Sequence, residues 1–326
     1  MENIKLTFIV PCFNEQGNID SFVNAARACL DVAEIKYELL FVNDGSTDST
    51  LEKLRKVARD AAGISDGPII QVISFSRNFG KESAIYAGLE SARGEYIGII
   101  DADLQQDPRI AFEMYKYLES HPECDIVAAY QEQRRESKVL SWFKRMFYKT
   151  FNATADEISI PPNMSDFRVF RRCVAQALLQ MPEYLRFSKG LFSWIGFNLH
   201  PMPYTPNERY EGSSSWSFGK LMKYATDGIL SFTTWPLKVA KWIGAIAFIG
   251  SFLYLLYVLI VDYLIKGIGI PGYPTLVCLI LLFGGIQLLV LGIMGEYMAR
   301  EYLEVKRRPI YIAKERIDSL EPSEDA

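Results

Sequence analysis

The sequence of 326 residues has few histidines, no paired cysteines and one long stretch with very little charge. Its two histidines, His121 and His200, are too few for a histidine-rich metal site. The five cysteines lie far apart with no Cys-x-x-Cys pair, which argues against zinc clusters and a disulfide framework and suits a reducing compartment. The formal net charge is −4 and there is no basic run, so nucleic acid is not an expected partner.

Charge is scarce between Pro236 and Ala299, where five of 64 residues are charged, whereas the other 262 residues carry 69 of the 74 charges. Within this stretch, Trp242–Val261 gives 20 residues without a charge and Thr275–Gly295 gives 21. Each run matches the roughly 20 residues that cross a bilayer core as a helix. A buried helical hairpin is the alternative. We expect a two-span transmembrane hairpin.

Basic residues flank both expected spans on their outer sides. Lys238 and Lys241 precede the first span, and Arg300 and Lys306–Arg308 follow the second. By the positive-inside rule, both flanks face the cytosol. The first residues also lack the pattern of a cleaved signal peptide. The sequence therefore predicts a multi-pass protein of the cytoplasmic (inner) membrane, with both termini and the globular part in the cytosol.

The first half of the chain alternates apolar runs with stretches of helical spacing. This rhythm is typical of an α/β domain with a mostly parallel sheet, in which ligands bind at the carboxyl ends of the strands. Polar motifs follow three of the expected strands. The expected strands are Leu6–Val10, Tyr37–Val42, Ile69–Phe75, Tyr96–Ile100 and Asp125–Ala129, and the expected helices are Ile19–Asp31, Thr50–Ala62, Glu82–Ala92 and Ile110–Ser120.

Asp101-Ala102-Asp103 follows the apolar run that ends at Ile100. Residues i and i+2 at a strand end point the same way, so both carboxylates can approach one cation. Oxygen ligands without His or Cys favour Mg²⁺ or Mn²⁺ over zinc, and such an ion would stabilise a leaving diphosphate. A solvated turn is the alternative for an isolated Asp-x-Asp.

Two other strand ends carry acidic turns. Val42–Ser49 is either a turn that caps the following helix or a loop in which Asp44 accepts hydrogen bonds from a base or ribose. Pro11–Glu15 is a rigid turn with one acidic side chain, and Arg77–Lys81 adds cations beside the same crevice.

Together these motifs resemble family-2 glycosyltransferases with the nucleotide-sugar-binding GT-A fold. Within them the chain is similar to polyprenyl-phosphate glycosyltransferases related to dolichol-phosphate mannose synthase, and especially to bactoprenol-phosphate glucosyltransferases with a two-span tail. The resemblance covers almost the whole chain. It rests on Ile9–Glu15, Val42–Ser49, Ser76–Gly80 with Ala84–Gly88, Asp101–Pro108, Ser165–Arg168, Lys189-Gly190, Trp194–Gly196, Gly295–Tyr297 and Lys306–Tyr311.

The resemblance implies a role for each matching position. The metal ligands would be Asp101 and Asp103, and the catalytic residues Asp103 and Asp166, with Asp166 acting as base or as an orienter of the acceptor. The nucleotide sugar would contact Pro11, Phe13, Glu15, Asp44, Asp101, Ala102, Asp103 and Gln105. The lipid phosphate would contact Arg134, Arg145, Arg168 and Arg209.

The resemblance also has two departures. Gln131 stands where family members carry an arginine after the fifth strand, and Ser215 stands where they carry a lysine. Two phosphate-binding cations are therefore missing from their usual places, and Arg134, Arg135 or Lys220 would substitute for them.

The implied reaction is an inverting transfer of a hexose from a nucleoside-diphosphate sugar to a polyprenyl phosphate, with Mg²⁺ or Mn²⁺ as cofactor. UDP-glucose is favoured by the resemblance alone; GlcNAc, galactose, mannose or an aminoarabinose derivative are the alternatives. A non-catalytic membrane scaffold is a further alternative. The membrane is an expected partner, and a homo-oligomer, with a tetramer suggested by the family, is an expected assembly.

The implied domain organisation has four parts. Residues 1–210 form the GT-A catalytic domain, and 211–235 form amphipathic helices at the membrane interface. Residues 236–299 form the two-span hairpin, and 300–326 form a cytosolic tail.

Overall fold

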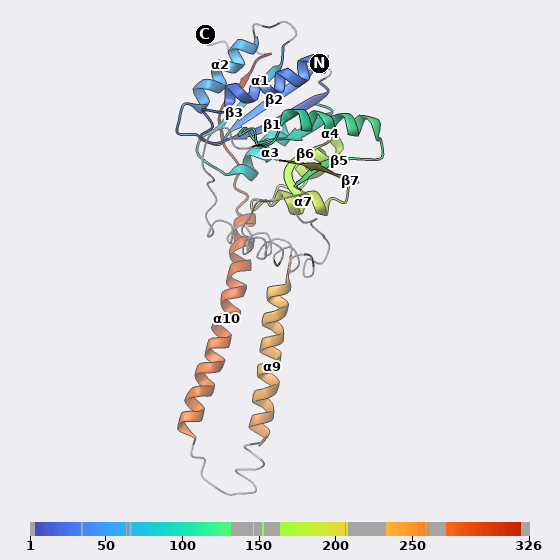
Figure 1. Cartoon of the computed structure of the whole chain (residues 1–326). Coiled ribbons are helices and arrows are strands. Elements are labelled where there is room, and N and C mark those ends of the chain that lie inside the picture. Colours follow the sequence, from blue (N-terminus) through green and yellow to red (C-terminus); the bar gives the residue numbers. More distant parts are fainter. Residues whose placement is uncertain are drawn as a thin grey trace.

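An eight-stranded sheet covered by helices on both faces stands at one end of two long helices (Figure 1). The computed structural model describes residues 4–33, 35–62, 64, 67–131, 146, 152, 164–205, 207, 233–257, 260 and 272–320. The amphipathic stretch expected at 211–235 lies almost wholly outside these residues.

The elements alternate between strand and helix up to the fifth strand, as the sequence predicts. All nine expected elements of this first half are present, with ends that differ by a residue or two. In chain order the elements are β1 (Leu6–Cys12), α1 (Ile19–Leu30), η1 (Asp31–Ala33), β2 (Tyr37–Asn43), α2 (Thr50–Ala62), β3 (Ile69–Phe75), α3 (Lys81–Ser91), β4 (Tyr96–Ile99), α4 (Pro108–Ser120), β5 (Ile126–Gln131), β6 (Met164–Arg171), α6 (Arg172–Leu179), α7 (Ser188–Trp194), β7 (Leu199–Tyr204), α9 (Trp235–Tyr257), α10 (Tyr273–Val305) and β8 (Ala313–Asp318).

The strand order across the sheet is β7-β5-β6-β4-β1-β2-β3-β8. Strands β1 to β4 run parallel, and β5 pairs in parallel with β7. Strands β6 and β8 run antiparallel to their neighbours. The sheet therefore has a parallel centre, where ligand crevices form in α/β folds, extended by antiparallel strands.

Alternate side chains of each central strand face opposite layers, because successive residues of a strand point to opposite sides. Phe8 packs with α1, α2 and α4, whereas its neighbour Ile9 packs with α3, α6 and α7. The second layer is tight: a Cβ on Gly88 of α3 would lie 2.3 Å from Ile9 Cγ2. A glycine at this position lets α3 approach the carboxyl end of β1 closely.

Helices α9 and α10 project away from the sheet (Figure 1). Their apolar segments, Trp235–Tyr254 and Leu282–Val305, have mean hydropathies of 1.4 and 1.5 and are almost unburied within the chain. Both are long and apolar enough to cross a membrane, and their exposure argues against a buried core hairpin. At 33 residues, α10 spans about 50 Å, which exceeds the roughly 30 Å of a bilayer core.

The described part of the segment expected as a cytosolic tail, residues 300–320, begins inside α10 and then forms a strand of the sheet. Strand β8 pairs antiparallel with β3, with Val72 opposite Ile317. The sequence Ala-Lys-Glu-Arg-Ile-Asp has no apolar alternation strong enough to predict a strand. It joins the sheet because α10 returns the chain to the exposed edge of β3, which offers unpaired backbone groups.

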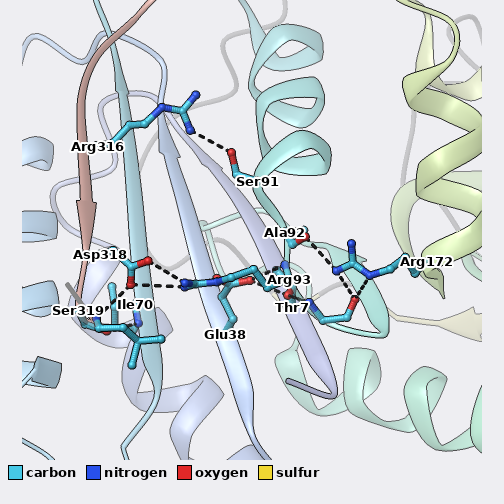
Figure 2. Close-up of polar contacts among 12 residues, drawn as sticks. Thr7, Glu38, Ile70, Ser91, Ala92, Arg93, Arg172, Arg316, Asp318 and Ser319 are labelled. Carbon is cyan, nitrogen blue, oxygen red and sulfur yellow. Dashed lines mark hydrogen bonds and ion pairs between the residues drawn. The ribbon is translucent and has the colours of Figure 1, made fainter. Parts of the chain in front are cut away.

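A buried charge network fastens β8 to the sheet (Figure 2). Glu38 is fully buried and accepts hydrogen bonds from Thr7 Oγ1 at 2.7 Å and Arg93 Nε at 2.7 Å. The same guanidinium donates to Asp318 of β8 at 2.7 Å. Arg93 thereby ties the sheet centre to the strand that follows α10.

Candidate active site

The carboxyl ends of β1 and β4 lie side by side at the point where the strand order reverses, and we call the region between the loops that follow them the crevice. Strand β1 has β2 on one side and β4 on the other. The chain therefore adds β2 and β3 on one side of β1 and then crosses to add β4 on the other. Crevices at such switch points are the usual ligand sites of α/β sheets. The loop Phe13–Glu15 directly follows β1, and the loop Asp101–Gln106 begins two residues after the end of β4. Two of the three predicted motifs therefore border one crevice, and the third lies one strand away, after β2.

The loops after β1 and β2 are held together by side-chain contacts to backbone. The Asn14 amide donates to Ser46 Oγ at 2.9 Å, and Thr47 N donates to Asn14 Oδ1 at 2.9 Å. Asn14 adopts a left-handed backbone conformation with φ +57°, which asparagine tolerates better than most residues. This conformation leaves Phe13 exposed at the crevice.

Asp44 at the end of β2 is buried, with 4% of its surface exposed. Its two carboxylate oxygens accept the amides of Phe79 at 2.6 Å and Gly80 at 2.9 Å. Burial raises the pKa of Asp44, and these two hydrogen bonds oppose the rise. Asp44 thus fixes the loop that leads into α3, while a carboxylate retains lone pairs for further donors.

Asp101 is oriented by a residue that the sequence reasoning passed over. Gln106 Oε1 accepts the Asp101 amide at 2.9 Å, and Gln106 Nε2 donates to Asp101 Oδ2 at 3.2 Å. Leu104, next to Asp103, has φ +59°, a strained conformation for a leucine. This kink turns the chain back so that Gln106 reaches Asp101. Gln106 is itself buried, so its amide group needs such a partner, but this burial is not visible in the sequence.

Asp166 lies near Asp101 because of the antiparallel pairing of β6 with β4. Ile99 pairs with Arg168, so two residues further on, past the end of β4, Asp101 comes level with Asp166. Lys81, the first residue of α3, lies between them: its Nζ is 2.6 Å from Asp101 Oδ1 and 4.0 Å from Asp166 Oδ2. Lys189 of α7 lies on the other oxygen of Asp166 at 3.9 Å.

The environment keeps Lys81 charged. Desolvation lowers the pKa of its amine, but the carboxylates of Asp101 and Asp166 outweigh this effect, and the pKa is raised above its ordinary value. Two carboxylates, those of Asp101 and Asp166, and the ammonium groups of Lys81 and Lys189 are therefore linked by contacts of 4 Å or less.

The residues present fit a divalent cation shared with a substrate. Asp101 and Asp103 would supply carboxylate oxygens, and within the described part of the chain no group of three or more His, Cys, Asp or Glu side chains is placed to hold a metal ion. Mg²⁺ typically takes one or two carboxylates and completes its coordination with waters and substrate phosphates. The Asp101 carboxylate already pairs with the ammonium of Lys81, so a metal ion bound there would compete with this lysine.

The other predicted nucleotide contacts lie around this crevice with different exposures. Pro11 and Glu15 are half-buried, Phe13 is exposed and Ala102 is buried. Glu15 Oε2 accepts Asn18 Nδ2 at 2.6 Å. The amide of Gln105 donates to Asp103 Oδ1 at 3.2 Å, which bends the loop around the carboxylate.

The predicted lipid-phosphate contacts are only partly within the described residues. Arg134, Arg145 and Arg209 lie outside them. Arg168 is buried, with 2% exposed; its guanidinium stacks over Phe192 at 4.1 Å and donates to the carbonyls of Ser165 and Asp166. This position holds the turn that carries Asp166, and it offers little surface to a phosphate.

A family model decides what kind of protein carries this crevice. The model described as glycosyl transferase family 2 matches residues 7–179, more than half of the chain, and this range includes Asp44, Asp101, Asp103 and Asp166. The chain belongs to the family-2 glycosyltransferases. Its mostly parallel sheet with the crevice after β1 and β4 is the GT-A-like fold of that family. This membership removes the non-catalytic scaffold from the alternatives.

Relatives of this glycosyltransferase match almost end to end. A putative glycosyltransferase of Bacillus subtilis, CsbB, is 39% identical over 311 residues, covering 95% of this chain and 91% of the relative. The bactoprenol glucosyl transferase of Shigella phage SfII is 36% identical over 316 residues, covering 95% and 98%. A prophage bactoprenol glucosyl transferase homolog of Escherichia coli is 35% identical over 316 residues, covering 95% and 99%.

Solved structures resemble this glycosyltransferase more distantly. Glucosyl-3-phosphoglycerate synthase from Mycobacterium tuberculosis, determined with Mn²⁺ and UDP-glucose, is 15% identical with a TM-score of 0.46, covering 70% of this chain and 78% of that one.

Proposed function

We propose that this glycosyltransferase transfers a hexose, with glucose favoured, from a nucleoside-diphosphate sugar to a polyprenyl phosphate at the cytosolic face of the membrane. The observation that carries the proposal is the approach of Asp101 and Asp166, with Lys81 between them. The domain that holds these residues is continuous in sequence with two apolar helices long enough to cross a membrane. Two relatives over 95% of the chain are named bactoprenol glucosyl transferase or its homolog, which supports the lipid acceptor and glucose.

The donor would bind along the crevice between the loops after β1 and β4. Pro11, Phe13 and Glu15 would contact the nucleoside, with Asp44 accepting from base or ribose through its remaining lone pairs. Gln105 and the backbone at Ala102 would lie beside the diphosphate. UDP is the favoured nucleotide, in keeping with the glucosyl relatives.

Asp101 and Asp103 would hold Mg²⁺ or Mn²⁺, which supplies charge stabilisation for the departing diphosphate. Gln106 keeps the Asp101 carboxylate in place for this task. Lys81 adds a positive charge on the same side. The acceptor phosphate oxygen attacks C1 of the sugar, and the C1–oxygen bond to the diphosphate breaks with its electron pair leaving on the nucleoside diphosphate, so the configuration inverts.

The long helices would place this chemistry at the headgroup plane. Lys238 and Lys241 stand at the start of α9, and Lys306–Arg308 follow the end of α10, all on the side of the catalytic domain. This distribution supports a cytosolic domain by the positive-inside rule. Tyr297 of α10 donates to the Thr233 carbonyl at 2.8 Å, which ties the two helices together on that side.

The chain would also assemble with copies of itself. Positions Gly284, Gly285, Gly292 and Gly295 of α10 have nothing within 4 Å of a built Cβ, so they are open to a neighbouring helix. A tetramer is the state that the family resemblance suggests. The mass of the purified chain in detergent, measured by light scattering, tests the number of copies.

The experiment is a donor panel on the purified full chain in detergent with undecaprenyl phosphate and Mn²⁺ or Mg²⁺. The donors are UDP-glucose, UDP-GlcNAc, UDP-galactose, GDP-mannose and a UDP-aminoarabinose derivative, and the readout is the mass of the lipid product. We expect a hexose adduct from UDP-glucose. An adduct from a different donor alone would replace the sugar assignment, and the absence of any lipid adduct would overturn the acceptor assignment.

A further inference from the structure

Asp166 lies between two ammonium groups that come from different elements. Lys81 of α3 approaches one carboxylate oxygen at 4.0 Å, and Lys189 of α7 approaches the other at 3.9 Å. Both distances exceed a hydrogen bond, so each lysine keeps donors available for another anion while remaining electrostatically paired with Asp166.

The position of Lys189 is set by buried contacts around it. Its neighbour Ser188 donates both its amide and its hydroxyl to Glu82 Oε2, and Ser188 itself is buried. On the other side, Leu191 and Phe192 are buried against the sheet. Glu82 directly follows Lys81 in α3, so one carboxylate links the two segments that carry the lysines. Lys189 is only 18% exposed as a result.

This lysine pair stands on the membrane side of the domain. The backbone amides of Tyr184 and Leu185, just before α7, donate to Glu304 Oε1 near the end of α10, at 2.9 and 3.3 Å. Figure 1 shows α7 on the side of the domain that faces α9 and α10. An acceptor anchored in the bilayer would reach the crevice from this side.

The electrostatics of the reaction require cations at this place. A phosphate monoester carries about −1.5 to −2 charges at pH 7. To reach the sugar it must pass close to the Asp166 carboxylate and to the donor diphosphate, both negative. Lys81 also pairs with Asp101 on the donor side. The ion pair of Lys189 among the described residues is with Asp166. Lys189 is thus placed to serve the acceptor.

We propose that Lys189 forms the subsite for the phosphate of the lipid acceptor, beside Lys81 on the donor side, and that Asp166 is the positioning residue that holds the two lysines. The inference rests on the proposed function. A phosphate monoester is already ionised at neutral pH, so Asp166 has no proton to remove. The attacking oxygen forms its bond to C1, the diphosphate leaves with the electron pair, and no proton transfer is needed.

The variants are Lys189→Met, with Lys189→Arg as the conservative substitution and Lys53→Met as the matched control. Lys53 is a lysine of α2 that pairs with Asp20 at 3.1 Å and is not among the predicted contacts of donor, metal or acceptor. The first measurement is calorimetric binding of farnesyl phosphate to each full chain in the presence of UDP and Mn²⁺. We expect Lys189→Met to weaken binding roughly ten- to hundred-fold, the range for losing a hydrogen bond to a charged group, and the other two to stay within about three-fold.

The second measurement determines KM and kcat separately for undecaprenyl phosphate. Lys189→Met should raise the acceptor KM by the same factor while the donor KM and the affinity for UDP with Mn²⁺ stay unchanged. Asp166→Asn should raise the acceptor KM. The rate of this variant should still increase with pH near pH 6, because that increase reflects the second ionisation of the acceptor phosphate. An unchanged acceptor KM and unchanged farnesyl phosphate affinity in Lys189→Met would overturn the subsite.

The two proposals fail in different ways. If the wild-type chain forms no lipid product with any donor, the proposed function fails, and the farnesyl phosphate measurement still decides the subsite. If the wild-type chain forms product and Lys189→Met binds farnesyl phosphate equally well, only the subsite fails. Loss of the rate rise near pH 6 in Asp166→Asn would restore Asp166 as the base.

Discussion

The ammonium nitrogen of Lys81 lies 2.6 Å from Asp101 Oδ1, the carboxylate that we assign to the divalent cation. Two cations cannot share that oxygen at full strength, so the lysine and the metal compete for it. A nucleoside diphosphate would relieve the competition, because Lys81 can then turn to a phosphate oxygen. Metal and nucleotide are therefore expected to bind together.

Lys81→Met should tighten binding of Mn²⁺ alone and weaken its coupling to UDP. Both partners are partly exposed, so the pair contributes about 1 kcal/mol or less, equivalent to a two- to five-fold change in affinity. Electron paramagnetic resonance of free Mn²⁺, titrated with and without UDP, measures both quantities. The Lys53→Met chain serves as control, and weaker Mn²⁺ binding in Lys81→Met would contradict the competition.

Arg93→Ala should destabilise the catalytic domain strongly. Glu38 is fully buried, and removing its guanidinium partner leaves an uncompensated charge, which costs about 3–5 kcal/mol of unfolding free energy. Arg55→Ala is the comparison: its pair with Glu315 is largely exposed and contributes about 1 kcal/mol or less. Denaturant unfolding of both chains in detergent tests the contrast. Equal losses of unfolding free energy in the two variants would show that the buried network stabilises the position of β8 no more than the exposed pair does.

Gly88→Ala should destabilise the domain by about 1–3 kcal/mol, the usual cost of overpacking a core. The added methyl would meet Ile9 Cγ2 at 2.3 Å, so α3 must shift away from β1 and take Lys81 with it. Thermal unfolding and UDP affinity should both change. The double variant Gly88→Ala with Ile9→Ala removes Ile9 Cγ2 and the rest of the contacting side chain, so its loss should be smaller than the sum of the two single losses; additive losses would place the strain elsewhere.

The stability of the chain should depend on pH through Glu82. Burial raises the pKa of this carboxyl above its ordinary value of 4.5, and the hydrogen bonds from Ser188 oppose the rise. A raised pKa means that the folded state favours the protonated form, so this contribution is present at pH 4.5 and below and is lost as the pH rises through the folded pKa. Glu82→Gln remains neutral at every pH.

The difference in unfolding free energy, wild type minus Glu82→Gln, should therefore decrease as the pH rises from 4.5 towards neutrality. Denaturant unfolding of both chains at matched pH values measures it. A difference that grows with pH would show that Glu82 is stabilised as the charged form, with Arg186 and Ser188 outweighing its burial.

The parallel centre of the sheet could be predicted from local pattern, because each strand there is an apolar run and each polar motif stands at its end. Strand β6 could not: Met164–Arg171 mixes Asp166 and Arg168 with aromatic residues, and its strand character comes from pairing with β4. Strand β8 is charged along its length and depends on α10 for its place at the sheet edge.

The acidic residues of the candidate site stand out in the sequence, whereas their partners could not be predicted. Asp101 and Asp103 are recognisable by spacing, and Asp166 by resemblance. The pairing of Lys81 with Asp101 depends on where α3 begins, and that of Lys189 with Asp166 on the contact between Ser188 and Glu82, 106 residues apart in the chain. Such contacts are set by tertiary packing, which leaves no periodic signal in the sequence.

The most direct test of the account is the mass of undecaprenyl phosphate after incubation with the purified chain, UDP-glucose and Mn²⁺. We predict an adduct of one hexose, with release of UDP in equal amount, and no adduct from Asp103→Asn, whose loss of a metal-binding carboxylate should lower turnover at least about 100-fold. An unchanged lipid mass with the wild-type chain, or an equal yield from Asp103→Asn, would contradict it.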